Sequence, residues 1–311
     1  MCYSAQIWQS HRSYARTFGA AIDAESFADL FGSRLGNAKI KLAKALECAF
    51  LEPDDAQMSQ IAGMVQDYRG QQVMQLEQEL FKQRKRLADA QRTLLTKTTQ
   101  AATDSLRIAT HKVDWLLTKL VDVRRDTLHD HDARIYPGYY APVMVMEGGK
   151  RVVKPMRYQC RPQGKPADYD TKYPGTYNAR RDNLQGFWKG QFGYTHGLMV
   201  VNAFYEHVTR TTLQGAANQI LEFRPRPSQD LLVACVWSRW THPAAPELLS
   251  FAAITDVPPP EVSAAGHDRC IIPIQPDHID AWLNPNPRDL AASYAILDDR
   301  VRPYFEHRQA A

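Results

Sequence analysis

The sequence has few cysteines, no long apolar run and little net charge, and each absence excludes a class of protein. Its five cysteines lie far apart and form no C-x-x-C pair, which argues against a structural zinc site and a disulfide framework. No stretch reaches the roughly 18 consecutive apolar residues of a membrane helix, and residues 1–30 lack the apolar core of a signal peptide. The net charge of +4 permits contact with nucleic acid without requiring it. We therefore expect a cytoplasmic protein with reduced thiols and no membrane partner.

The sequence motifs of several common enzyme classes are also missing. The chain contains no G-x-x-x-x-G-K-[ST], G-x-G-x-x-G, H-E-x-x-H or G-x-S-x-G. Nucleotide-binding loops, zinc peptidases and α/β-hydrolases therefore lack support. We expect neither a metal nor a cofactor.

Composition separates a central segment, residues 38–128, from the rest of the chain. Its only proline is Pro53, and it is dense in Gln, Lys, Arg, Ala and Leu, which favour helices. A heptad spacing predicts long helices that pair as an antiparallel coiled-coil hairpin. The residues that carry this spacing are Val73, Leu80, Leu87 and Leu94. The basic run Lys82–Arg86 lies on the same helix, either as a solvated face or as a patch that contacts phosphates.

The remaining sequence alternates between short helices and apolar strands, and it predicts an α+β fold. A helix is expected from Phe18 to Phe31, before the central segment. Beyond Asp132, proline and glycine punctuate apolar runs that are typical of strands. These runs are Val143–Met146, Leu198–Val201, Leu231–Trp237 and Leu249–Thr255. We predict a mixed β-sheet or barrel core with flanking helices, formed by residues 1–36 and 129–311 and interrupted by a helical insertion, residues 37–128.

Cys2 directly follows the initiator methionine. Aminopeptidases remove Met1 when a small side chain follows it, which leaves a free α-amine and a thiol on the same carbon. The amine titrates near pH ~8 and the thiol near ~8.5, so both are partly reactive at neutral pH. One of these nucleophiles can also act as the base for the other. Any residue can follow Met1, so position 2 alone does not establish any chemistry.

Three later segments carry candidate site residues. Glu206 ends an apolar strand, where burial would raise its pKa and suit it to proton transfer, unless it faces solvent. His267 lies in a loop of small residues and is a candidate acid or base, or a structural histidine. Asn178, Arg180 and Arg181 could hold a carbonyl group and phosphates, or could form an ordinary capped turn.

Taken in order along the chain, these motifs resemble those of the SRAP family, the SOS-response-associated peptidases. The resemblance rests on Cys2, on Asn178-Ala179-Arg180, on the strand that ends at Glu206, and on Gly266-His267-Asp268-Arg269. It covers roughly residues 1–30 and 133–285 and leaves the helical insertion outside. The family usually begins Cys-Gly-Arg, whereas this chain has Tyr3-Ser4 after the cysteine, which removes an arginine that would contact phosphate.

The resemblance implies an SRAP-like core and a sensor of abasic sites in single-stranded DNA. Cys2 would form a covalent thiazolidine crosslink with the abasic sugar, and the removal of Met1 could be autoproteolytic. The enzyme class would be that of a hydrolase or a lyase. The implied catalytic residues are Cys2, Asn178, Glu206 and His267, and the implied DNA-binding residues are Arg180, Arg181 and Arg161.

Two other interpretations remain open. N-terminal-nucleophile amidohydrolases such as glutamine amidotransferases also begin Met-Cys, although this chain lacks their Asn-Gly element. A non-enzymatic protein could instead use the helical insertion to bind a partner protein or a second copy of itself. A stable adduct with abasic DNA would support the abasic-site sensor. Glutamine hydrolysis would support the amidohydrolase.

Overall fold

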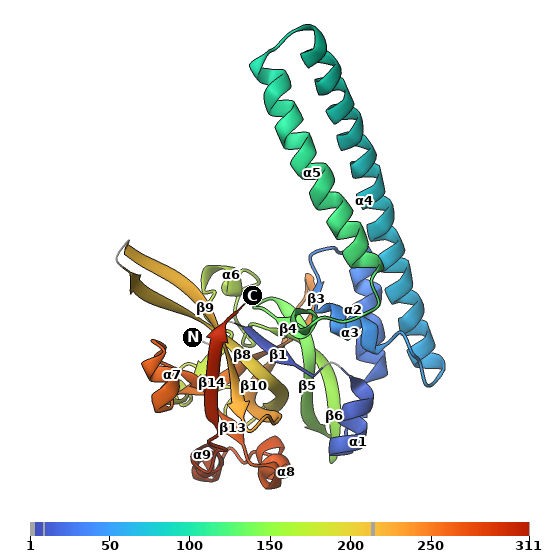
Figure 1. The fold of residues 1–311 in the computed structure, drawn as a ribbon. Coiled ribbons are helices and arrows are strands. Elements are labelled where there is room, and N and C mark those ends of the chain that lie inside the picture. The colour runs from blue at the N-terminus through green and yellow to red at the C-terminus, as the bar shows by residue number, and fades with distance from the viewer. Residues whose placement is uncertain (1–3, 9, 213–214, 311) are drawn as a thin grey trace.

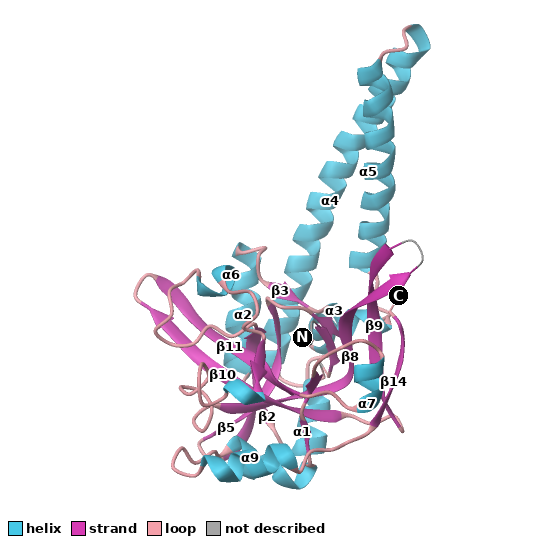
Figure 2. Ribbon diagram, turned by 90° about the vertical axis from the view of Figure 1, so that its left-hand side faces the viewer, coloured by secondary structure: helices cyan, strands magenta, loops and turns pink. Residues whose placement is uncertain are grey.

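A β-rich core carries a long two-helix hairpin that projects away from it (Figure 1). The structure is a computed structural model, and it describes residues 4–8, 10–212 and 215–310. The two ends of the described chain lie on the core, and the tip of the hairpin lies far from the strands (Figures 1 and 2). The expected α+β class with a helical hairpin is therefore confirmed.

Five strands of the core pair in a closed ring. Each strand pairs with the next, and the last pairs back with the first. A sheet that closes on itself leaves no exposed edge between these strands. In order around the ring they are β5 (Tyr139–Glu147), β6 (Lys150–Tyr158), β11 (Ala245–Asp256), β10 (Leu231–His242) and β8 (His196–Thr212).

Shorter strands extend this ring, and two of them matter for the site. The N-terminal strand β1 (Ser4–Ile7) pairs with β8, and β7 (Asn178–Arg180) runs parallel to β11. Both therefore bring distant parts of the chain onto the ring. The others are β2 (Ala21–Ile22), β3 (Lys41–Leu42), β4 (Arg134–Ile135), β9 (Gly215–Arg226), β12 (Cys270–Ile271), β13 (Pro273–Ile274) and β14 (Tyr304–Gln309).

Short helices pack around the strands. The single helix expected from Phe18 to Phe31 is wrong, because Gly19 takes a left-handed conformation (φ +60°) and ends a first helix. Asp23 then caps the start of a second helix by accepting a hydrogen bond from the Ser26 amide. The helices are α1 (His11–Phe18), α2 (Ala24–Gly36), α3 (Lys44–Ala49), α6 (Tyr169–Lys172), α7 (Pro260–Ala264), α8 (Ile279–Leu283) and α9 (Leu290–Asp298), with 3₁₀ turns η1 (Asp130–Ala133), η2 (Arg181–Asn183) and η3 (Pro276–His278).

The strands separate two apolar clusters. Leu198 and Val200 of β8 join a cluster that also contains residues of α2, α3, α8 and α9. Met199 and Val201, which point to the opposite side of the strand, join a second cluster with residues of α7 and β14. Both faces of β8 are therefore buried, so a charged side chain on this strand must be accommodated inside the protein.

The hairpin consists of α4 (Ala56–Thr96) and α5 (Gln100–Arg124). At about 1.5 Å per residue, α4 is roughly 60 Å long. Of the expected heptad residues, Leu80 forms a small apolar seam with Leu116 and Leu120 of α5, and Val73 packs against this seam. No helix in the described ranges is long and apolar enough to cross a membrane.

The base of the hairpin belongs to the main core. Leu46 and Phe50, in and just after α3, are fully buried, as is Ile61 in the first turns of α4. The aromatic ring of Phe50 packs against Phe27 and Phe31 of α2, at 5.1 and 5.4 Å between centroids. The segment expected as an insertion therefore contributes side chains to the core before the hairpin leaves it.

Candidate active site

Glu206 is buried within the core. It lies on β8 between Tyr205, which pairs with Ser4 of β1, and the exposed His207. On its other side Glu206 pairs with Leu221 of β9. Its side chain is 0% exposed, so the strand holds a carboxylate away from bulk water. A buried carboxylate is costly unless another polar group faces it.

His267 is the side chain that faces Glu206. It lies in the loop between α7 and β12, directly after Gly266, whose φ of +98° favours glycine. Its Nε2 lies 3.2 Å from Oε2 of Glu206, and its Nδ1 lies 2.9 Å from the carbonyl oxygen of Arg269. Burial lowers the pKa of His267, partly offset by the hydrogen bond to Arg269.

The hydrogen bonds of His267 fix where its protons can be. A carbonyl oxygen can only accept, so Nδ1 carries a proton and donates it to Arg269. Nε2 then faces the Glu206 carboxylate, and a single further proton can lie on either group. In one state an imidazolium faces a carboxylate, and in the other a neutral imidazole faces a carboxylic acid. Such a pair can give and take a proton at one place.

Asn178 reaches the same end of the core from another strand. In β7 it pairs with Ala253 of β11, and two residues further Thr255 pairs with Ile271 of β12, close to the His267 loop. Asn178 is buried, and no described residue forms a hydrogen bond with its side-chain oxygen or nitrogen. Buried amides are almost always hydrogen-bonded, so this one is available for a ligand.

The three predicted DNA-binding arginines have different surroundings. Arg180 follows Asn178 at the surface and pairs with Asp182. Arg181 pairs with Asp298 at 2.5 Å. Arg161 is half-buried and lies before α6, where it pairs with Asp170 of α6 at 2.7 Å and its guanidinium lies over the ring of Trp240. Arg180 thus lies closest in the sequence and the sheet to the buried amide, whereas Arg161 anchors α6.

An open groove of about 440 Å³ begins at Asn178 and Arg180. Four aromatic side chains line it, together with Lys172. The rings of Tyr169 and Phe187 are nearly parallel, at 14°, with centroids 6.2 Å apart. The aromatic residues are Tyr169, Tyr173, Phe187 and Trp188. Aromatic rings beside a cationic rim are typical of a surface that stacks unpaired bases.

Arg134 of β4 was not predicted from the sequence. It is buried, its Nε donates a hydrogen bond to Oγ of Ser4 at 2.9 Å, and its guanidinium lies 3.7 Å from the centre of the Tyr205 ring. It therefore ties the first described residue of the chain to the strand that carries Glu206. No local motif marks Arg134, because its partners lie 130 positions before it and 71 after it.

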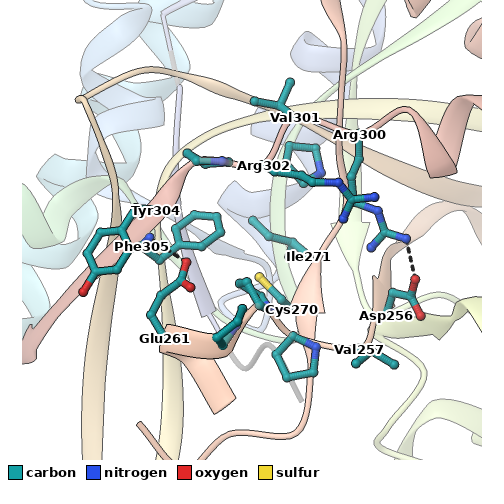
Figure 3. Close-up of a pocket in the computed structure, with 15 residues that line it drawn as sticks. Asp256, Val257, Glu261, Cys270, Ile271, Arg300, Val301, Arg302, Tyr304 and Phe305 are labelled. Carbon is teal, nitrogen blue, oxygen red and sulfur yellow. Dashed lines mark hydrogen bonds and ion pairs between the residues drawn. The ribbon is translucent and has the colours of Figure 1, made fainter. Parts of the chain in front are cut away.

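A separate pocket of about 600 Å³ lies at β12, the strand that follows the His267 loop in the chain (Figure 3). Its walls come from α7, β12 and residues 300–305. Glu261 accepts a hydrogen bond from the Phe305 amide, and Arg300 pairs with Asp256 across the opposite side. These contacts hold the C-terminal segment against α7 and the end of β11.

Cys2 lies outside the described residues, whereas the other four cysteines are described. Cys160, Cys235 and Cys270 are buried, and burial raises the pKa of each thiol, that of Cys160 to about 12. Cys48 is half-buried, and its sulfur accepts a hydrogen bond from Arg69. Their raised pKa values make Cys160, Cys235 and Cys270 poor nucleophiles at neutral pH.

The fold and site define a β-barrel protein with a buried acid–base pair beside its N-terminal strand. The sequence matches the model of the SOS response associated peptidase (SRAP) family over residues 91–307, more than half of the chain. The chain belongs to this family. The matched range includes Asn178, Glu206 and His267.

Three solved structures are similar to the chain. A protein from Bordetella bronchiseptica is 17% identical, with a TM-score of 0.46 over 58% of this chain and 87% of that one. A protein from Bacteroides thetaiotaomicron is 14% identical, with a TM-score of 0.46 over 57% and 77%. A phage-related protein from B. bronchiseptica is 19% identical, with a TM-score of 0.42 over 57% and 80%. A search of curated proteins gives no significant match.

Proposed function

We propose that this protein senses abasic sites in single-stranded DNA and forms a covalent crosslink with them through Cys2. The observation that carries the proposal is the Glu206–His267 pair, which lies beside the strand that begins the described chain. Ser4 pairs with Tyr205, the neighbour of Glu206. Cys2 precedes Ser4 by two peptide units, so their Cα atoms are separated by at most about 7.6 Å.

The proposed crosslink forms in two balanced steps. The neutral α-amine of Cys2 adds to the aldehyde of the ring-opened sugar, and loss of one water gives an imine. The thiol sulfur then adds to the imine carbon, and its proton is transferred to the nitrogen, which closes a five-membered thiazolidine. Only an N-terminal cysteine has both groups free. The second step is intramolecular, which lowers its barrier strongly.

His267 and Glu206 supply the proton transfers that these steps require. The first step needs a proton on the departing hydroxyl, and the second needs removal of the thiol proton. A pair that shares one proton can do both in turn. The hydrogen bond from Nδ1 to Arg269 keeps Nε2 directed at Glu206 throughout.

The groove at Asn178 suits the DNA strand. The free side-chain amide of Asn178 can bind a sugar oxygen and the N-terminus, while Arg180 and Arg181 contact phosphates. Tyr173 is 48% exposed and offers a ring for stacking with a neighbouring base. Arg161 acts through Asp170, which it holds in place next to Tyr169.

Intact-mass spectrometry before and after incubation with abasic single-stranded DNA tests the proposal. The untreated protein should lack Met1, and the treated protein should gain the mass of the DNA minus one water. Cys2→Ser should lose the heat-stable adduct, although borohydride could still trap an imine at its amine. Cys48→Ser is the matched control, because it removes a half-buried thiol and should keep the adduct.

Two results would refute the crosslinking mechanism. The first is active protein that retains Met1, and the second is a heat-stable crosslink in Cys2→Ser without borohydride. Hydrolysis of glutamine without any adduct would favour the N-terminal-nucleophile amidohydrolase instead.

A further inference from the structure

The positive charge of the protein is concentrated in the outer part of the hairpin, residues 82–112. This segment has eight Lys and Arg against two Asp, a net charge of +6, so the remainder of the chain carries −2. All eight basic side chains are exposed. They are Lys82, Arg84, Lys85, Arg86, Arg92, Lys97, Arg107 and Lys112. A rod with this charge, carried by a slightly acidic body, is an electrostatic footprint for a polyanion.

One side of the hairpin gathers several of these charges around a groove. The groove has a volume of about 560 Å³ and runs between α4 and α5, with Lys82, Lys85 and Arg86 along its α4 wall. Arg86 crosses it and donates a hydrogen bond to Ser105 of α5. Lys112 lies seven residues after Ser105, two turns along the same side of α5. We name Lys82, Lys85, Arg86 and Lys112 the basic face.

Few carboxylates of the protein lie close enough to neutralise the charges of the basic face. Asp89 is the carboxylate in the groove lining, and it pairs with Arg92 at 3.3 Å. Lys82 lies 3.9 Å from Glu79. Among the described residues, Lys85 and Lys112 have no carboxylate partner. Their charges are therefore available to phosphate groups from outside.

We infer that the basic face docks the phosphate backbone of duplex DNA. No aromatic residue lines the groove. The exposed rings of Phe81 and Trp115 lie outside this lining, and Nζ of Lys112 is 5.5 Å from the centre of the Trp115 ring. The groove itself therefore offers no ring on which an unpaired base could stack. A single strand would gain little there beyond its charge. A duplex keeps its bases stacked inside and presents one negative charge per roughly 1.7 Å of its axis to a straight helical rod. This docking is separate from the proposed crosslink, which involves single-stranded DNA at the core.

Binding of the full-length protein to an undamaged duplex of about 20 base pairs tests the inference, because it requires no crosslink. Titrations by fluorescence anisotropy at several salt concentrations give both the affinity and its salt dependence. The variant K85Q/K112Q should weaken binding about 5- to 10-fold at low salt and lower the salt slope by about 2. The matched control R84Q/R107Q removes two exposed charges outside the basic face and should change the affinity less than about 2-fold.

Each other outcome overturns the inference. Equal losses in the two variants would mean general attraction without a docking face, and no loss in either would mean that the hairpin does not bind DNA. A single strand of the same length that binds more tightly than the duplex, and loses this affinity in K85Q/K112Q, would show that the basic face binds single-stranded DNA. Preferential binding to anionic vesicles, or a self-association measured by light scattering that only K85Q/K112Q abolishes, would identify a membrane or a second copy as the occupant.

Discussion

Polar groups in the core site and polar groups in the outer hairpin are held in opposite ways. In the core, Glu206 faces His267 from 61 positions away, and Arg134 bonds Ser4 across 130 positions, all four side chains being buried. In the hairpin, exposed Arg92 pairs with Asp89 only three positions away. The core site therefore exists only when the whole barrel is folded, whereas the hairpin surface needs two helices and a seam. A change in one region should leave the other unaffected.

The largest expected effect is on the chemistry of the core site. Glu206→Gln keeps the size of the side chain but removes its ability to exchange a proton with His267. We expect the crosslinking rate with abasic single-stranded DNA to fall by roughly 10²- to 10⁴-fold, the usual range for a lost general acid or base. Single-turnover gel assays measure this rate.

The hairpin variant K85Q/K112Q is the control for this comparison. It should crosslink at the wild-type rate, because its changes lie outside the core. Comparable losses in Glu206→Gln and K85Q/K112Q would show that the two regions act as one DNA site. An unchanged rate in Glu206→Gln would remove Glu206 from the mechanism.

The second effect concerns stability and the base of the hairpin. Phe50→Ala removes a fully buried ring between Phe27 and Phe31 and should cost about 3–5 kcal/mol of unfolding free energy. Leu95→Ala near the hairpin tip, where the side chain is 86% exposed, should change it by less than about 0.5 kcal/mol. Urea denaturation followed by circular dichroism measures both. Similar values for the two would mean that the boundary between core and hairpin is misplaced.

The third effect is a dependence of core stability on pH that comes from His196. This histidine is buried against Trp282, and burial lowers its pKa to about 3. The unfolded chain binds a proton at this residue below pH ~6.5, but the folded protein does so only near the lower value. Its contribution is therefore complete above pH ~6.5 and is lost as the pH falls through that window.

The variant His196→Gln isolates this contribution. Its deficit in unfolding free energy relative to wild type should shrink by about 2–3 kcal/mol between pH 6.5 and 4.5. Denaturation at several pH values measures the difference. A constant deficit would show that His196 is protonated in the folded protein.

The same contrast explains what the sequence could predict. The hairpin follows from the heptad spacing of Leu80, Leu87 and Leu94, because helix periodicity is a local property. The ring strands follow from apolar runs, but their order does not, because β6 pairs with β11 about 90 positions later. The left-handed turn at Gly19, which divides the expected helix, depends on local backbone geometry that a periodic pattern does not show.

Candidate site residues could be named from the sequence only where a local motif marks them. Asn178, Glu206 and His267 lie in short motifs, so each could be named before its partners were known. Arg134 could not, because nothing near it in the sequence marks it, and the barrel alone places it beside Ser4. The aromatic groove was missed as a unit, since its rings come from α6 and from the turns before β8.

The smallest expected effect, and the sharpest test of the comparison, comes from excising residues 83–109 and joining Lys82 to Thr110 through a short glycine-rich turn. This deletion keeps the whole apolar seam around Leu80, Leu116 and Leu120, as well as every buried residue of the core clusters. The shortened protein should unfold in one cooperative transition within about 1 kcal/mol of wild type, and it should crosslink within about 2-fold of the wild-type rate. Its affinity for undamaged duplex DNA should fall at least as far as that of K85Q/K112Q, because Lys85 and Arg86 are gone.

Three outcomes would contradict this expectation. A molten product would show that the outer hairpin supports the core, and an intact duplex affinity would show that the duplex binds outside the hairpin. Loss of crosslinking with the fold preserved would mean that the hairpin holds the single strand at the core site, which would join the two regions that their contacts now separate.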